Sequence, residues 1–152
     1  MDRNRQHVPF LIFPLMALAI GGGTAFGSER WVTLQAINWV ENPQNSTKVG
    51  ARGELGPYQF KPSTWRMHTK KPFALAVQRQ AADEVAVRHY EWLKRGLENN
   101  RIDATPYNIA LAWNAGLDQV VSGHVPASAQ EYASQVSNLV EDLKARLAAK
   151  SP

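Results

Sequence analysis

The sequence contains no cysteine among its 152 residues. No disulfide can therefore stabilise the fold, although an exported domain is free to use one. The absence also removes any cysteine for lipid attachment. With 44% hydrophobic and 20% charged residues, the composition is that of an ordinary globular protein, and the length suits one domain with one core. Packing alone must hold that core together.

Several kinds of functional motif are also missing. The chain has no nucleophile elbow, no phosphate-binding loop and no cysteine nucleophile. His68, His89 and His124 are far apart in the sequence without metal-ligand spacing, so we expect no metal and no cofactor. We interpret the adjacent acids Asp83 and Glu84 as a solvated helix face.

The charge balance is basic but diffuse. The formal net charge is +4 and the isoelectric point is about 9.6, which favours an anionic partner such as nucleic acid, acidic lipid or a cell-wall polymer. The basic residues are scattered, and we find no basic stripe and no nucleic-acid-binding motif. We expect a cell-wall partner and no nucleic acid.

The first residues have the pattern of a secretory signal. Arg3 and Arg5 precede an uncharged apolar run at 10–20, and small residues follow at 21–25. This run of eleven residues is short of the roughly 20 that a membrane-spanning helix needs. We therefore prefer a cleaved signal to the alternative, an uncleaved anchor.

Cleavage after Ala25 or Gly27 satisfies the small-residue rule. We predict a signal peptide at 1–27 and a single domain at 28–150. The protein is then expected in the periplasm or outside the cell, as a monomer that meets the membrane only through its signal. A secretion or envelope machine is a further candidate partner for an exported wall enzyme.

The remaining sequence predicts a mainly α domain, with no convincing alternating strand. Apolar spacing, capping residues and prolines predict five helices. Four of them cover residues 28–41, 73–97, 105–115 and 128–149, and a short one begins at residue 62. In these, Ser28 serves as an N-cap, a hydroxyl caps the helix before Trp65, and Thr105-Pro106 begins the fourth. A loop is expected around 123–126.

Glu41 stands at the end of the first predicted helix, because the residue before Pro43 avoids the α conformation. Gly56 follows it by fifteen residues and Gln59 by eighteen, across a loop rich in glycine and polar residues. Glycosidic cleavage needs a carboxyl group that keeps its proton near neutral pH, which apolar burial and the negative end of a helix favour. An isolated Glu is more often an ordinary solvated residue, and the downstream spacing favours the functional interpretation.

Four segments, spread over 37–140, resemble the catalytic domain of lytic transglycosylases and goose-type lysozymes. The first segment is Glu41 with its loop. The second, Gly56-Pro57-Tyr58-Gln59, stands where the family has Gly-Leu-Met-Gln. The third, Ala112-Trp113-Asn114-Ala115-Gly116, resembles the family's Ala-Tyr-Asn-Ala-Gly, and the fourth, Glu131-Tyr132-Ala133, resembles its Asn-Tyr-Val. The sequence departs from the family pattern in three places. Asn42 replaces the Ser after the acid, Pro57-Tyr58 replaces Leu-Met, and Trp113 replaces Tyr.

The resemblance implies a lysozyme-like fold and cleavage of the β-1,4 bond between N-acetylmuramic acid and N-acetylglucosamine. Glu41 is then the single acid and later base, and Gln59, Tyr58, Asn114 and Tyr132 line the substrate cleft. The C6 hydroxyl of the sugar attacks to give a 1,6-anhydro product.

Each matched residue also has a structural interpretation. Asn114 suits a helix end, Tyr132 a helix core and Gln59 a plain loop, while Trp65 and Trp113 are by default packing residues. Two other functions stay open. A hydrolytic muramidase of the same fold would need a second acid, for which Glu54, Glu131 and Asp118 are the candidates, and an inactive glycan-binding protein would have no need of Glu41.

Overall fold

The computed structural model describes residues 23–149, and the side chains of 29–149. This part of the chain is mainly helical, as predicted, and contains no strand beyond one isolated bridge between Leu55 and Phe60. Its elements in chain order are α1 Gly23–Glu41, α2 Pro62–His68, the short 3-10 helix η1 Phe73–Val77, α3 Arg79–Asn99, α4 Pro106–Ala115, α5 Leu117–Ser122 and α6 Ala127–Ala148.

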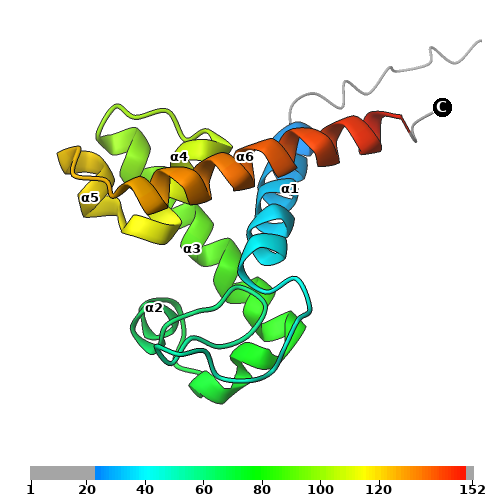
Figure 1. The fold of residues 1–152 in the computed structure, drawn as a ribbon, viewed down its shortest axis with the longest axis vertical. Helices are drawn as coiled ribbons and strands as arrows, with labels where there is room; N and C mark the ends of the chain where they lie inside the picture. The colour runs from blue at the N-terminus through cyan, green and yellow to red at the C-terminus, as the bar shows by residue number, and fades with distance from the viewer. Residues whose placement is uncertain (1–22, 150–152) are drawn as a thin grey trace, which may run out of the picture.

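The helices form an upper and a lower group joined by α3 (Figure 1). α6 lies across the upper group, where it packs on α4 and α1, and α5 follows α4. The lower group holds α2, η1 and the long loop that leaves α1. α3 contacts elements of both groups, including α1, α4 and α2. The end of α1 therefore lies where the two groups meet.

The core is continuous from one group to the other. Leu34 and Ile37 of α1, Leu93 of α3 and Val136 of α6 are fully buried. Trp65 is also fully buried, and its indole nitrogen donates to the Lys71 carbonyl at 2.8 Å. The expectation that Trp65 is a packing residue is confirmed.

The first helix begins earlier than predicted. α1 starts at Gly23, so Ser28 lies inside the helix and is not its N-cap. The reason is that no proline interrupts residues 23–28, and nothing forces the chain out of the helical conformation. The predicted signal peptide lies mostly outside the described residues, and its cleavage positions fall in the first turns of α1. No helix within 23–149 is long and apolar enough to cross a membrane.

Two other helix predictions need correction, and one helix was missed. The predicted helix 73–97 is two elements, because Gln78 takes an extended conformation between η1 and α3. α2 has Lys61 as its N-cap without a side-chain cap, because the Lys61 ammonium group carries only donors and cannot accept from a backbone N–H. The short helix α5 was not predicted.

The predicted start and end of α4 are confirmed. Thr105 is its N-cap, and the Thr105 hydroxyl accepts a hydrogen bond from the Asn108 N–H at 3.2 Å. Pro106 occupies the first turn and Gly116 follows the last residue. Glu41 is likewise the last residue of α1, as the position of Pro43 predicted.

Candidate functional site

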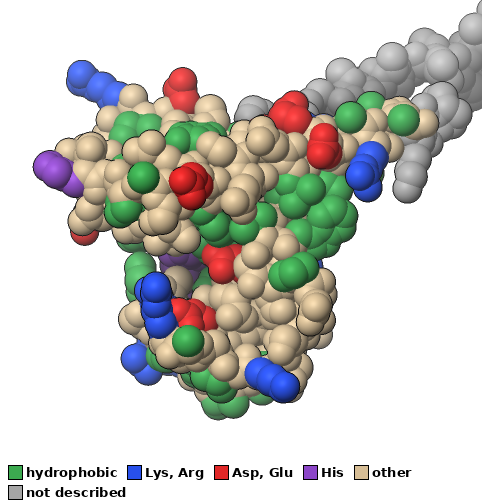
Figure 2. Space-filling view, viewed as in Figure 1, with side chains coloured by type: hydrophobic (Ala, Val, Ile, Leu, Met, Phe, Trp, Pro, Cys, Tyr) green, Lys and Arg blue, Asp and Glu red, His purple; other side chains and the backbone are tan. Residues whose placement is uncertain are grey.

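A cleft of about 620 Å³ opens between the upper and lower groups, within the range of about 300–1,000 Å³ usual for small-molecule sites. Figure 2 shows this face hollowed between the two groups, with acidic side chains beside the hollow. Residues from α1, the following loop, α2, α3, α4 and α5 line it: Glu41, Arg52, Glu54, Gln59, Phe60, Lys61, Thr64, Met67, His89, Trp92, Leu93, Ala112, Trp113, Asn114, Ala115, Gly116, Leu117, Asp118 and Gln119.

Glu41 contributes a carboxyl group to this cleft from the C-terminal end of α1. Burial raises the pKa of Glu41, and the negative charge of Glu54 raises it further. The Tyr132 hydroxyl and the charge of Lys61 act in the opposite direction. Because burial is the largest of these influences, the site favours the protonated carboxyl that a general acid requires.

Tyr132 approaches Glu41 from α6. Its hydroxyl is buried and has no well-formed hydrogen bond within the described residues, yet it lies close enough to Glu41 to influence the pKa of that carboxyl. Burial and the neighbouring Glu41 raise the pKa of Tyr132 well above its usual value, so the phenol stays protonated. Tyr132 is not among the residues lining the cleft, so it neighbours Glu41 without forming part of the cleft wall.

The turn at 56–59 carries Gln59 into the cleft. Gly56 and Gln59 both have positive φ, at 82° and 45°, which only glycine adopts at no cost. The Gln59 side-chain amide donates to the Gly56 carbonyl at 2.8 Å. A Cβ at Gly56 would lie 1.8 Å from the Ala76 carbonyl oxygen. The glycine therefore permits the turn to pack directly on η1.

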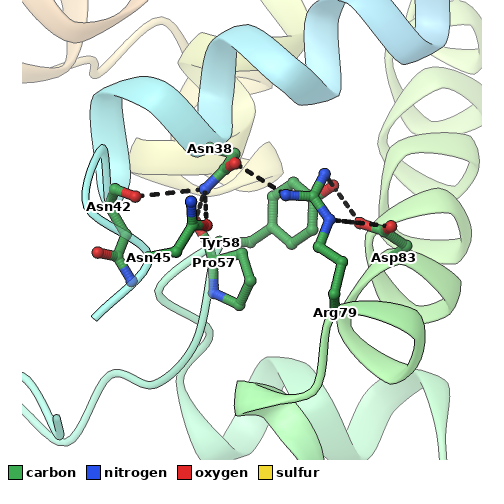
Figure 3. A network of polar contacts seen from close by, with 7 residues as sticks. All are labelled: Asn38, Asn42, Asn45, Pro57, Tyr58, Arg79 and Asp83. Atoms are coloured by element: carbon green, nitrogen blue, oxygen red, sulfur yellow. Dashed lines mark hydrogen bonds and ion pairs between the residues drawn. The ribbon is translucent and has the colours of Figure 1, made fainter. Parts of the chain in front are cut away.

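Asn42 and Asn38 tie the end of α1 to this turn. Figure 3 shows the contacts of Asn38. The Asn42 amide donates to the Gly56 carbonyl at 3.1 Å, and the Asn38 amide donates to the Pro57 carbonyl at 2.8 Å. The Asn38 carbonyl oxygen in turn accepts from the Arg79 guanidinium at 2.9 Å. Asn42, the departure from the Ser of the resembled pattern, thus has a structural role here.

Tyr58 does not lie on the cleft wall, where the resemblance had placed it. Tyr58 is 1% exposed and does not line the cleft. Its hydroxyl donates to the Asp83 carboxylate at 2.6 Å and accepts from Arg79 at 3.3 Å. The side chain turns inward because this ion pair and the aromatic neighbours Phe60 and Trp113 receive it.

The acidic pair on α3 is also more engaged than predicted. Asp83 pairs with Arg79 at 2.9 Å and accepts the Tyr58 hydroxyl. Glu84 pairs with Lys71 at 2.7 Å. The interpretation of both as a plain solvated face is corrected for Asp83, which is three-quarters buried at its side chain.

The structure separates the candidates for a second acid. Glu54 and Asp118 line the same cleft as Glu41, whereas Glu131 is exposed and lines a different depression with Tyr107 and Gln135. A hydrogen bond from its own backbone N–H lowers the pKa of Glu54, and the Arg52 backbone N–H at 2.9 Å adds to this. Glu54 is therefore an ionised carboxylate beside Glu41.

Asn114 lies in the last turn of α4, exposed and on the cleft wall. The C-cap of α4 is Gly116, whose backbone N–H donates to the Ala112 carbonyl, so Asn114 does not cap the helix. Trp113 is half-buried and lines the cleft while it packs on Tyr58 and Phe60. The structure thus brings Glu41, Gln59 and Asn114 to one cleft, with Tyr132 against Glu41.

Sequence reasoning missed the cleft residues of α2 and α3. His89 lines the cleft and shares a hydrogen bond of 2.9 Å with His68, although the two histidines are 21 residues apart. Distance along the sequence therefore did not indicate that these two histidines are neighbours in the fold. No group of three metal-ligating side chains occurs within 23–149. The i, i+3 spacing of His89 and Trp92 on one helix was the available signal.

Comparison of the chain with protein-family models found no matching family, and comparisons with curated proteins and with solved structures found no match either.

Proposed function

We propose that this protein is an exported enzyme of lysozyme-like fold that cleaves peptidoglycan glycan strands, with Glu41 as the acid. The observation that carries the proposal is the half-buried Glu41 carboxyl, whose pKa is raised, facing a cleft of about 620 Å³ that Gln59 and Asn114 also line. A carboxyl of this kind is the central requirement for protonating a glycosidic oxygen. The amides supply partners for sugar hydroxyl and acetamido groups.

The charges in the cleft also suit a wall polymer. Arg52 and Lys61 line it together with the acids. The cationic side chains suit the carboxylates of peptidoglycan, and the acids leave the cleft unsuited to a polyanion such as nucleic acid.

In the proposed reaction Glu41 donates its proton to the bridging oxygen as the bond to the sugar C1 breaks. The acetamido oxygen of the substrate stabilises the positive C1 on the opposite face. The Glu41 carboxylate then accepts the proton of the C6 hydroxyl, whose oxygen bonds to C1 and gives a 1,6-anhydro end. Glu41 recovers its proton, so one carboxyl group completes the cycle. The Tyr132 hydroxyl stabilises the Glu41 carboxylate between the two steps.

A second candidate is a hydrolytic muramidase, and the position of Glu54 favours it. Glu54 is ionised and lines the cleft beside Glu41. A carboxylate so placed is suited to orient a water molecule, which would attack C1 and give a reducing end instead of an anhydro end.

The test is mass spectrometry of purified sacculi digested with the wild-type protein and with Glu41→Gln. Anhydro ends support the transglycosylase and reducing ends the muramidase, and both should disappear in Glu41→Gln. The loss expected for removal of a general acid is on the order of 10²–10⁴-fold. Glu131→Gln, an acid outside this cleft, is the matched control and should digest normally.

Full digestion by Glu41→Gln would refute the catalytic assignment. Absence of digestion by the wild-type protein, with retained binding to sacculi, would identify an inactive glycan-binding protein instead. Export to the wall, the monomeric state and any envelope machine partner belong to the same proposal, and fractionation of cells that express the full chain tests the first of these.

A further inference from the structure

Part of the cleft wall is apolar and aromatic, and the proposed chemistry at Glu41 does not use it. Met67 of α2 and Trp92 of α3 both line the cleft, and they are 54% and 37% exposed. Large apolar side chains gathered on a concave wall, and not scattered singly over a surface, are typical of a ligand site.

Trp92 is held in place by a histidine. The His89 ring stacks on the Trp92 ring with centroids 5.8 Å apart and an interplanar angle of 11°. The His89 Nδ1 is bonded to the His68 Nε2 at 2.9 Å, and the His89 ring meets Trp113 edge to face at 4.8 Å. These contacts fix the orientation of the Trp92 indole before any ligand arrives, which reduces the entropy lost on binding.

His89 also offers a polar atom. The ring lines the cleft, and its Nε2 makes no hydrogen bond within the described residues. Burial lowers the pKa of His89 to about 3, so the ring is neutral at physiological pH. A neutral imidazole nitrogen either donates or accepts one hydrogen bond, and a sugar hydroxyl can match both tautomers.

We propose that Met67, Trp92 and His89 form a binding subsite for one pyranose ring of an N-acetylhexosamine strand. The apolar face of the sugar lies on the Trp92 indole, Met67 covers its edge, and the His89 Nε2 bonds a hydroxyl group. The inference rests on the proposed function, since it places a further sugar of the same strand in the same cleft. It assigns to α2 and α3 a share of glycan recognition.

The experiment uses the full chain carrying Glu41→Gln, so that cleavage does not interfere, and chitotetraose, the β-1,4-linked tetramer of N-acetylglucosamine, as the probe. Titration is followed by NMR of the tryptophan indole N–H signals. We expect the Trp92 signal to shift, together with the His89 ring signals, while the Trp31 signal stays in place. Trp31 is the matched reference because it is similarly exposed, at 44%, and lines a different groove.

Trp92→Ala should weaken tetramer binding about tenfold, as expected for loss of one aromatic stacking surface, and Trp31→Ala should leave the affinity unchanged. Trp92→Phe, which keeps a ring, should bind with intermediate affinity. An unshifted Trp92 signal, absence of tetramer binding, or equal weakening by Trp31→Ala would each overturn the subsite. The NMR result does not depend on whether Trp92→Ala folds.

Failure of the subsite is distinguishable from failure of the proposed function. Digestion of sacculi by Glu41→Gln would refute the catalytic role while leaving tetramer binding measurable. Conversely, loss of digestion in Glu41→Gln together with an unperturbed Trp92 would leave the enzyme assignment intact and remove the subsite.

Discussion

The Gly56 carbonyl accepts the Asn42 side-chain amide at 3.1 Å. The same carbonyl accepts the Gln59 amide at 2.8 Å. One backbone oxygen therefore connects Asn42, the residue directly after Glu41, to Gln59, which enters the cleft from the turn at 56–59. The distance between acid and amide in the cleft depends on this turn keeping its conformation.

Gly56→Ala should disrupt the turn. The new Cβ would meet the Ala76 carbonyl oxygen at 1.8 Å, and the residue would keep a φ of 82°. Backbone on both sides must move, so we expect a loss of more than about 2 kcal/mol in the free energy of unfolding. Urea denaturation measures it.

Gly53→Ala is the matched control, because Gly53 lies in the same loop with a φ of 81°, and a Cβ added there would meet nothing within 4 Å. Gly53→Ala should lower the free energy of unfolding by about 1 kcal/mol, because alanine is strained at this positive φ. Equal losses for the two variants would show that the approach to Ala76 is unimportant.

Asn38→Ala should destabilise the fold through lost hydrogen bonds. Asn38 is 2% exposed, and its removal leaves the Pro57 carbonyl and the Arg79 guanidinium without this partner. An unsatisfied buried group costs about 1–3 kcal/mol. The Pro57 carbonyl belongs to a buried residue, whereas the Arg79 side chain is 51% exposed and keeps Asp83 as a partner, so a loss of about 1–3 kcal/mol is expected in thermal or urea unfolding.

The control is Asn100→Ala, whose exposed amide donates to the Gly96 carbonyl at 2.8 Å. Water replaces that bond, and the change should stay within about 0.5 kcal/mol. If Asn38→Ala lowers the free energy of unfolding no more than Asn100→Ala does, the hydrogen bonds of Asn38 do not stabilise the fold.

Glu54→Gln should move the basic limb of the pH–rate profile to lower pH. Proton donation needs the neutral Glu41 carboxyl, so the rate falls as the pH rises through the pKa of Glu41. The Glu54 charge is one of the influences that raise this pKa, and the amide removes the charge. Initial rates on sacculi between about pH 4 and 8 measure the limb.

Glu131→Gln, outside the cleft, should leave the limb in place. An unshifted limb in Glu54→Gln would show that the two acids are not coupled. Loss of reducing ends in Glu54→Gln would instead assign water positioning to Glu54.

The stability of Glu41→Gln relative to the wild-type protein should depend on pH. Burial raises the pKa of Glu41 in the folded state, so the folded state binds this proton more tightly than the unfolded chain. The resulting stability is present below the unfolded pKa and is lost as the pH rises through the folded pKa. Glutamine does not titrate, and the variant should therefore gain relative stability between about pH 4 and pH 7.

Urea unfolding of both proteins at the two pH values gives the difference. A constant difference would mean that Glu41 has an ordinary pKa, and the argument for a protonated acid would lose its basis.

His89 should make the fold sensitive to acid. Burial lowers its pKa to about 3, from 6.5, so the unfolded chain binds a proton that the folded state excludes. Stability is full above the unfolded pKa and falls by up to about 1.4 kcal/mol per pH unit between those values. His89→Gln should show a shallower loss in urea unfolding between about pH 6.5 and 4, and parallel slopes would contradict the assignment.

Local rules in the sequence determined much of the architecture. Asn42-Pro43 ends α1 and so puts Glu41 in its last turn, and Thr105-Pro106 begins α4, because capping and proline sterics act within a few residues. The same local rules do not predict the end of η1 at Gln78. There the conformation depends on the packing of η1 against the turn at Gly56, which is distant in the sequence.

Tertiary structure alone decided which side chains share a space. Tyr58 turned inward because Asp83 and Arg79, more than twenty residues away along the chain, receive its hydroxyl. Glu54 lines the same cleft as Glu41, whereas Glu131 lines a different depression. Such choices depend on contacts between distant segments, whose relative positions follow from packing the whole core and are not encoded in any local spacing.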